Sequence, residues 1–145
     1  MDESLAEEAL SYGSDYTRMI SQIKQALETA RGCVAIVLKP SLLGFERSVL
    51  LSRMAHEDLS IGAVYTSTFN SGLGLSMVSF VASASDESAN EKLRYPHGIS
   101  TYSVLGADTL SPPFSSYVSA NGNINLSSLG NALHGLGLDL SLIHI

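Results

Sequence analysis

Two continuous apolar runs lie in the first half of the chain, at residues 33–38 and 61–65. Neither run alternates hydrophobic and polar positions. A strand that is buried on both faces, as in a parallel sheet, has this pattern. We therefore predict buried parallel strands over residues 34–38 and 62–68.

Apolar residues recur with helical spacing in two segments, one before the first predicted strand and one between the two strands. Ile20, Ile23 and Leu27 recur at positions i, i+3 and i+7, which predicts a helix over residues 3–30, interrupted near residues 12–14. A second helix is predicted over residues 45–58. The residues expected on its core-facing side are Phe45, Val49 and Leu50.

The pattern becomes weaker after the second strand. Residues 73–84 predict another apolar helix, and the polar stretch 83–90 predicts a loop. One short strand is expected within residues 97–109. Asn121-Gly122 lies between two short apolar segments and predicts a hairpin, and residues 126–136 predict a last short helix.

Polar residues follow each predicted strand, which favours an α/β fold of one particular kind. Lys39-Pro40 comes directly after the first strand, and Thr66, Ser67 and Thr68 end the second. A parallel β/α barrel builds its sites from residues at the carboxyl ends of its strands. A complete barrel needs about 250 residues, whereas this chain has 145. The chain is therefore either a small open α/β domain or the C-terminal part of a barrel.

Composition narrows the classes of partner. A chain with 45% hydrophobic and 15% charged residues is globular, and its length suits one core. The net charge of −6 argues against nucleic acid and anionic membrane surfaces as partners. We see no apolar run long enough to span a membrane and no secretory signal. The single cysteine, Cys33, rules out a disulfide framework within the chain.

The motifs at the strand ends resemble those of a known family. Lys39-Pro40 with Gly44, followed by Tyr65-Thr-Ser-Thr-Phe-Asn-Ser-Gly-Leu-Gly-Leu75, resembles the o-succinylbenzoate synthases of the enolase superfamily. That family has Lys-Pro…Gly at the sixth barrel strand and Glu-Ser-x-Leu-Gly-Leu at the seventh. Asp2-Glu3-Ser4 is similar to the Asp-Glu-Ser of the fifth strand. His97-Gly-Ile-Ser-Thr-Tyr102 is similar to a motif in the synthase domain of multifunctional phylloquinone proteins of plants and algae.

The resemblance implies a fold and an activity. Residues 1–110 would be the back half of an enolase-superfamily (β/α) barrel, strands five to eight, and residues 111–139 a C-terminal segment of the same domain. The implied reaction is dehydration of 2-succinyl-6-hydroxy-2,4-cyclohexadiene-1-carboxylate to o-succinylbenzoate, in phylloquinone or menaquinone biosynthesis. The implied cofactor is Mg²⁺ or Mn²⁺, because the reaction passes through a dianionic enediolate. The location would be the chloroplast for a plant or algal protein of this type, and otherwise the cytoplasm.

The resemblance also implies roles for individual residues. Lys39 would be the catalytic lysine that stabilises the anion, and Asp2 would be the third metal ligand. Gly106 would offer a backbone N–H near the eighth strand. The residues expected to line the pocket and bind the substrate's carboxylate are Thr66, Ser67 and Thr68.

The chain departs from the family in three respects. Asn70 stands where the family usually has Glu. The family's other catalytic lysine and its first two metal carboxylates would lie upstream of Met1, so we expect the chain alone to be inactive. We also expect it to be poorly stable, because an opened barrel exposes strand edges and apolar helix faces. In the full-length protein, fusion to other quinone-pathway domains is implied. Residues 140–145 match the in-frame translation of a common sequencing adapter, and we interpret them as adapter-derived; the alternative is a natural amphipathic tail.

Other interpretations remain open at this point. An N-acylamino acid racemase or dipeptide epimerase of the same superfamily would share the lysine and the metal. A non-catalytic small α/β binding domain would use neither. Gly72-Leu-Gly74 lacks the third glycine of a dinucleotide-binding motif, and no Gly-x-Ser-x-Gly hydrolase motif is present. The four histidines have no ligand spacing and are expected at the surface or in loops.

Overall fold

The computed structural model describes residues 15–138. Asp2, the first part of the predicted N-terminal helix, His144 and the interpreted adapter segment lie outside the described residues. The elements in chain order are α2 (Tyr16–Thr29), β1 (Ala35–Leu38), α3 (Pro40–Leu43), α4 (Phe45–Glu57), β2 (Gly62–Tyr65), α5 (Gly72–Ser88), the 3₁₀ helices η1 (Glu91–Leu93), η2 (Ser100–Val104) and η3 (Phe114–Tyr117), and α6 (Leu126–Gly135).

The two strands form a short parallel sheet, as predicted. They pair in a register that runs from Ala35 opposite Gly62 to Leu38 opposite Tyr65. A parallel bridge between Thr66 and Gly98 adds a third position to this sheet. Three successive segments, separated by α4 and α5, are thus parallel neighbours. The fold is mixed α/β, and the described residues form an open sheet rather than a closed barrel.

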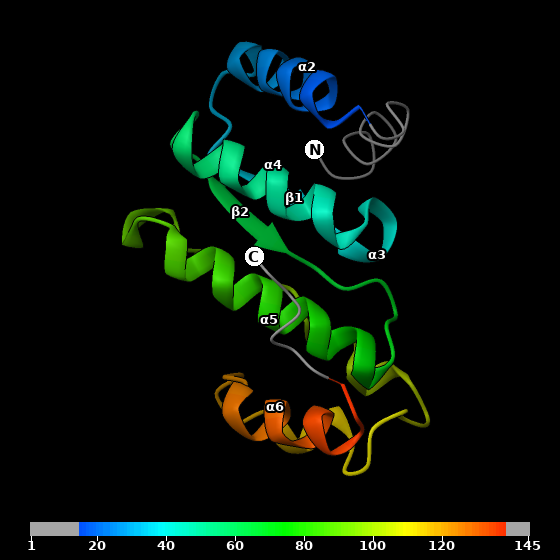
Figure 1. Ribbon diagram of the computed structural model, residues 1–145. Coiled ribbons are helices and arrows are strands. Elements are labelled where there is room, and N and C mark those ends of the chain that lie inside the picture. The colour runs from blue at the N-terminus through cyan, green and yellow to red at the C-terminus, as the bar shows by residue number, and fades with distance from the viewer. Residues whose placement is uncertain (1–14, 139–145) are drawn as a thin grey trace.

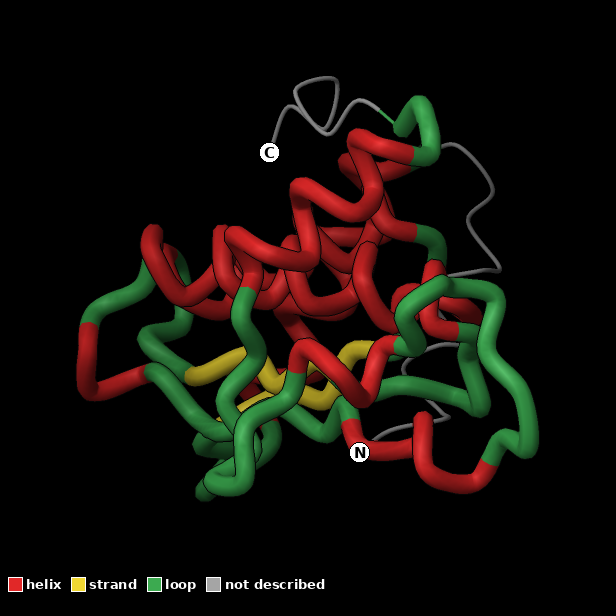
Figure 2. Tube along the Cα trace, turned by 90° about the horizontal axis from the view of Figure 1, so that it is seen from below, coloured by secondary structure: helices red, strands yellow, loops and turns green. Residues whose placement is uncertain are grey.

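Helices cover one face of this sheet. Figure 1 shows α2, α4, α5 and α6 side by side in this order, and Figure 2 shows these helices on one side of the strands. The strand side chains that face the helices are fully buried: Ile36, Leu38, Ala63 and Tyr65. On the other face, Ala35, Val37 and Val64 are only half-buried. The prediction of strands buried on both faces is therefore wrong for the described residues, because no helix layer covers the second face.

Helix α4 has nearly the predicted bounds but a different core-facing side. Phe45 is 36% exposed and Val49 and Leu50 are half-buried, whereas Ser48, Leu51, Ser52, Met54 and Ala55 are buried. Small serine side chains let α4 approach the sheet and α5 closely, which a count of apolar positions does not anticipate.

The buried hydroxyl of Tyr65 lies against this side of α4. Its Oη atom donates to the backbone oxygen of Ser48 at 3.4 Å, and the hydroxyl of Ser85 on α5 donates to that of Ser52 at 3.3 Å. Burial raises the pKa of the Tyr65 phenol above its ordinary value, although hydrogen bonds to Ser52 and Ser85 oppose this effect. The serines thus satisfy a polar group in an otherwise apolar interface.

Helix α5 is longer than predicted. It covers 17 residues, so the polar stretch expected to be a loop is helical up to Ser88. Its serines satisfy their hydroxyls within the helix, as when Ser76 donates to the backbone oxygen of Gly72 at 2.7 Å and Ser79 to that of Leu75 at 2.8 Å. Because these hydroxyls need no water, a serine-rich helix can be buried here.

The C-terminal part follows the predictions in outline. The strand expected within residues 97–109 is reduced to the Gly98 bridge followed by η2, and the hairpin is a single antiparallel bridge between Val118 and Ile124. Helix α6 is present as predicted, with the Asn125 side chain accepting from the backbone N–H of Ser128 at 3.0 Å. None of the helices among residues 15–138 is long and apolar enough to cross a membrane.

Candidate functional site

The sheet brings Lys39 and Thr66 together. The backbone N–H of Thr66 donates to the oxygen of Leu38 at 2.9 Å, which continues the parallel ladder past the last paired residues. Side chains alternate along a strand, so Lys39 shares a face with Val37, and Thr66 shares that face with Val64. Both residues therefore lie at the carboxyl ends of neighbouring strands, on the face away from the helices.

The chain after Lys39 turns immediately into a helix. Pro40 occupies the first helical position of α3, where its missing N–H costs nothing. The backbone oxygen of Lys39 accepts hydrogen bonds from the N–H groups of Leu42 and Leu43, both at 2.9 Å. Pro40 and Leu43 are buried, so the backbone of Lys39 is held in place while its half-buried side chain lies at the sheet edge.

The three hydroxyl residues at the end of β2 are not equivalent. The Oγ1 atom of Thr66 is buried and has no hydrogen-bond partner among the described residues. Its methyl group packs on Gly98, where an added Cβ would lie 3.0 Å from Thr66 Cγ2. Ser67 instead shares a 2.7 Å hydrogen bond with the Thr101 hydroxyl. A ligand bound to Thr66 Oγ1 would therefore break no hydrogen bond among the described residues, whereas one bound to the Ser67 hydroxyl would compete with Thr101.

Thr68 contributes through its backbone. Its N–H donates to Oδ1 of Asn70 at 2.8 Å, and Nδ2 of Asn70 donates to the Ser41 hydroxyl at 2.5 Å. Sequence reasoning noted Asn70 only as a departure from a family pattern. The structure shows that Asn70 connects the loop after β1 with the loop after β2.

We observe no contact between Gly106 and the residues at the ends of β1 and β2. It is exposed and lines a separate cavity of about 260 Å³ with Gly72 and Asp108, next to the N-terminus of α5. Its predicted role near the substrate remains a prediction.

Asp108 caps the N-terminus of α5. Its Oδ1 accepts from the backbone N–H of Gly72 at 2.8 Å, and its Oδ2 accepts from that of Phe114 at 2.6 Å. A Cβ at Gly72 would overlap the Asp108 carboxylate. A Cβ at Gly74 would press on the side chain of Asn70 at 3.0 Å. Because Gly72 and Gly74 have no side chains, the Asp108 carboxylate and the Asn70 amide can pack against the first turn of α5.

These hydrogen bonds decide the charge state of Asp108. Partial burial on its own would raise the pKa of the carboxyl group. The backbone N–H groups of Phe114, Leu110, Gly72 and Thr109 outweigh this effect and hold the pKa below its ordinary value. Sequence reasoning missed Asp108, because the glycine and the aspartate that meet are 36 residues apart.

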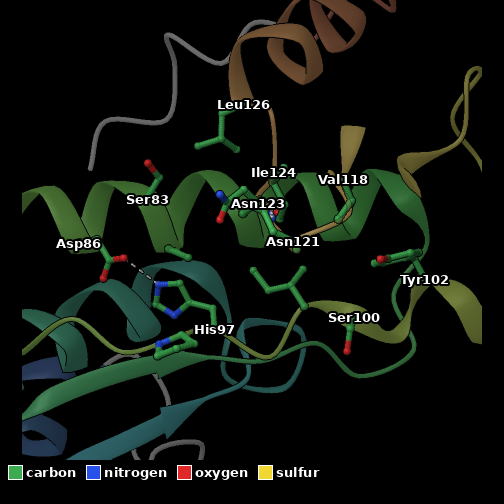
Figure 3. Close-up of a pocket in the computed structure, with 15 residues that line it drawn as sticks. Ser83, Asp86, His97, Ser100, Tyr102, Val118, Asn121, Asn123, Ile124 and Leu126 are labelled. Carbon is green, nitrogen blue, oxygen red and sulfur yellow. Dashed lines mark hydrogen bonds and ion pairs between the residues drawn. The ribbon is translucent and has the colours of Figure 1, made fainter. Parts of the chain in front are cut away.

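Another cavity lies elsewhere (Figure 3). It has a volume of about 620 Å³ and lies between α5, the segment around His97 and the bridge from Val118 to Ile124. Its wall combines apolar side chains with the carboxylate of Asp86 and the two asparagines Asn121 and Asn123. None of the residues predicted for the synthase site lines it.

His97 holds one end of this cavity in place. Its Nδ1 accepts from the backbone N–H of Tyr65 at 3.1 Å, and Nε2 lies 3.2 Å from Oδ2 of Asp86. A neutral imidazole ring that accepts a hydrogen bond at Nδ1 carries its proton on Nε2. This N–H group therefore donates a hydrogen bond to the Asp86 carboxylate. His97 lies outside regular secondary structure, as expected, but its side chain is only 14% exposed, so it is not a surface histidine.

The described residues do not form a magnesium site. No group of three acidic, histidine or cysteine side chains that could hold a metal ion occurs within residues 15–138. The strand ends carry an ammonium group, hydroxyls and an amide, whereas Mg²⁺ prefers carboxylate oxygens. The predicted ligand Asp2 lies outside the described residues.

Comparison with known proteins finds one similar curated protein. The chain is 36% identical over 92 residues to "Protein PHYLLO, chloroplastic" from Arabidopsis thaliana, an alignment that covers 57% of this chain and 5% of that protein. No protein family matches the sequence, and no solved structure is similar to it. The chain is thus related to a small part of a much longer chloroplast protein.

Proposed function

We propose that this chain is the C-terminal part of an o-succinylbenzoate synthase domain. The reaction converts 2-succinyl-6-hydroxy-2,4-cyclohexadiene-1-carboxylate to o-succinylbenzoate and water, in phylloquinone or menaquinone biosynthesis. One observation carries the proposal: Lys39 and the unpartnered hydroxyl of Thr66 are neighbours at the carboxyl edge of a parallel sheet. The similarity to PHYLLO supports a link to the same pathway and a chloroplast location.

The fold of the described residues supports a barrel origin. Three parallel positions separated by helices, with a helix layer on one face only, are what a segment of a (β/α) barrel would contribute. In this proposal residues 1–110 supply strands five to eight and residues 111–139 a C-terminal segment. The half-buried sheet face would then point into the barrel, where the remaining strands of the domain would cover it.

The residues at the strand ends suit the chemistry of the reaction. A proton next to the ring carboxylate is removed, a second negative charge develops on that carboxylate, and the hydroxyl group leaves as water while the ring becomes aromatic. The ammonium group of Lys39 would stabilise the developing charge, and the Thr66 hydroxyl would donate a hydrogen bond to the carboxylate. Such interactions are strong where a site excludes water. Mg²⁺ or Mn²⁺ belongs to the proposal through Asp2 and upstream carboxylates, and we derive no step through it.

Replacing Lys39 tests the proposal. The parent protein, meaning the natural protein that contains residues 1–139, is assayed with the synthase substrate. We expect Lys39→Ala to lower kcat by about 10²- to 10³-fold, the loss typical for one charge-stabilising group. Lys92→Ala is the control, because Lys92 is an exposed lysine on η1, remote in sequence from the strand ends. Undiminished activity of Lys39→Ala would overturn the role of Lys39, and an inactive wild-type parent would overturn the synthase function itself.

The same parent protein separates the alternatives. An N-acylamino acid racemase or dipeptide epimerase would exchange the substrate's α-proton with solvent deuterium and leave the synthase substrate unchanged. A non-catalytic binding domain would neither exchange the α-proton nor convert the synthase substrate. In that case the 620 Å³ cavity beside His97, whose size falls in the range of small-molecule pockets, would be the place to look for a ligand.

A further inference from the structure

Asn70 contacts both loops that carry the candidate site. Its Nδ2 donates to the hydroxyl of Ser41, two residues after Lys39, at 2.5 Å. Its Oδ1 accepts from the backbone N–H of Thr68, two residues after Thr66, at 2.8 Å. One side-chain amide therefore connects the chain segments that follow the two neighbouring strands.

The position of Asn70 is itself fixed by its surroundings. Its side chain lies against Gly74 in the first turn of α5, where an added Cβ would come within 3.2 Å of Asn70 Cβ. The preceding residue, Phe69, has a φ angle of +48° and is 70% exposed. A bulky residue rarely adopts this left-handed conformation, which persists only where other contacts impose it. The hydrogen bond from Thr68 to Asn70 spans Phe69 and is the contact that closes this turn.

We propose that Asn70 is a positioning residue that sets the distance between Lys39 and Thr66. This role rests on the proposed synthase function. The Nδ2 group of the amide donates to the loop after β1, and its Oδ1 atom accepts from the loop after β2. An apolar side chain can make neither hydrogen bond. If the link is lost, the loop after β2 can relax from its strained turn. The ladder would still pair Thr66 with Leu38, but the side chains of Lys39 and Thr66 at its end would be held less rigidly relative to each other.

The first measurement is independent of catalysis. Amide hydrogen exchange at Thr68 is compared in the wild-type parent protein and in Asn70→Ala. We expect exchange at Thr68 to become about tenfold faster, because its acceptor is removed, while exchange in β1 and β2 stays unchanged and shows that the fold is intact. Asn90→Ala is the matched control, since Asn90 accepts in the same way from the backbone N–H of Lys92 at 3.1 Å but caps η1. Unchanged exchange at Thr68 would overturn the inference.

The second measurement is synthase activity of the same variants. We expect kcat to fall about 10- to 100-fold in Asn70→Ala, as for other small misplacements of a catalytic group. Asn70→Asp should recover most of this loss, because aspartate still accepts from Thr68 and the Ser41 hydroxyl can turn to donate. Asn70→Leu keeps similar bulk without either hydrogen bond, so recovery by aspartate and not by leucine would show that the hydrogen bonds, rather than the bulk of the side chain, position the site.

The outcomes separate the two levels of the proposal. Full activity in Asn70→Ala, with faster exchange at Thr68, would mean that Asn70 closes the loop without positioning the site. A wild-type parent without synthase activity would end the proposed function and the positioning role with it. The exchange experiment would still show whether Asn70 links the two loops.

Discussion

Residues 33–88 and residues 89–138 are stabilised in different ways. In the first region two strands and their helices pack through fully buried side chains such as Leu38, Leu51 and Leu75. In the second region 3₁₀ helices and single bridges alternate with loops, and α6 is the one longer helix among its described residues. Individual polar side chains hold these short elements, with Asp108 bonding three backbone N–H groups and Asn125 capping α6.

The difference teaches where single substitutions matter. In the first region the free energy of folding is spread over many apolar contacts, so the loss of one polar side chain should change the free energy of unfolding little, even where it affects the site. In the second region one carboxylate holds several segments in place, so its removal affects residues distant in sequence. The candidate site lies at the junction, where Ser67 and Thr66 contact Thr101 and Gly98 of the second region.

Cavity formation should distinguish the two regions most strongly. Leu51 on α4 and Leu129 on α6 are both fully buried, and replacing either by alanine should cost about 2–5 kcal/mol. Hydrogen exchange of the parent protein should accelerate across β1 and β2 in Leu51→Ala, but only around α6 and η3 in Leu129→Ala. If Leu129→Ala also accelerates exchange in β1, the regions open as one unit and the comparison fails.

An added methyl group should disturb the contact between the two regions where Gly72 meets Asp108. Gly72→Ala places a Cβ on the Asp108 carboxylate, and we expect a loss of about 1–3 kcal/mol, as for other overpacked positions. Gly135→Ala is the matched control, because nothing lies within 4 Å of its added Cβ at the end of α6. Protease sensitivity of residues 105–117 should rise in the first variant and not in the second. Equal resistance of both variants would show that the Asp108 cap is dispensable.

Acid should loosen the second region before the first. The folded-state pKa of Asp108 lies below the ordinary value of 3.8. Its contribution to stability is therefore complete above that value and is lost as the pH falls through the folded-state pKa. The Tyr102 ring, which packs on Phe114 with centroids 5.6 Å apart, should report this change by NMR. Asp108→Asn should remove this pH dependence, with a loss of about 1 kcal/mol at neutral pH. An unchanged acid transition in this variant would assign the effect to another group.

Sequence patterns predicted the regular elements well and their surroundings poorly. The parallel strands, α4 and α6 agree with the predicted ranges, because apolar runs and helical spacing are local properties. The core-facing side of α4 was wrong, since Ser48 and Ser52 are buried where α4 packs against Tyr65, which lies on another element. The length of α5 was underestimated, because the intrahelical hydrogen bonds of its serines are not visible in composition.

The candidate site shows the same division. The motif around Lys39 and the hydroxyl residues after β2 could be recognised from the sequence, and so could the order in which they follow the strands. That Lys39 and Thr66 are neighbours follows from the register of β1 and β2. The roles of Asn70 and Asp108 could not be predicted, because each depends on a partner 29 or 36 residues away.

The sequence by itself determined the α/β character of this chain, the placement of its strands and helices, and the polar residues that end each strand. These features depend on the spacing of apolar residues and on local turn chemistry, both of which are written along the chain. The tertiary structure alone decided which hydroxyl lacks a partner, which glycines admit a carboxylate or an amide, and which face of the sheet remains open. Those properties arise from contacts between segments distant in sequence, and their energies depend on geometry that no local pattern contains.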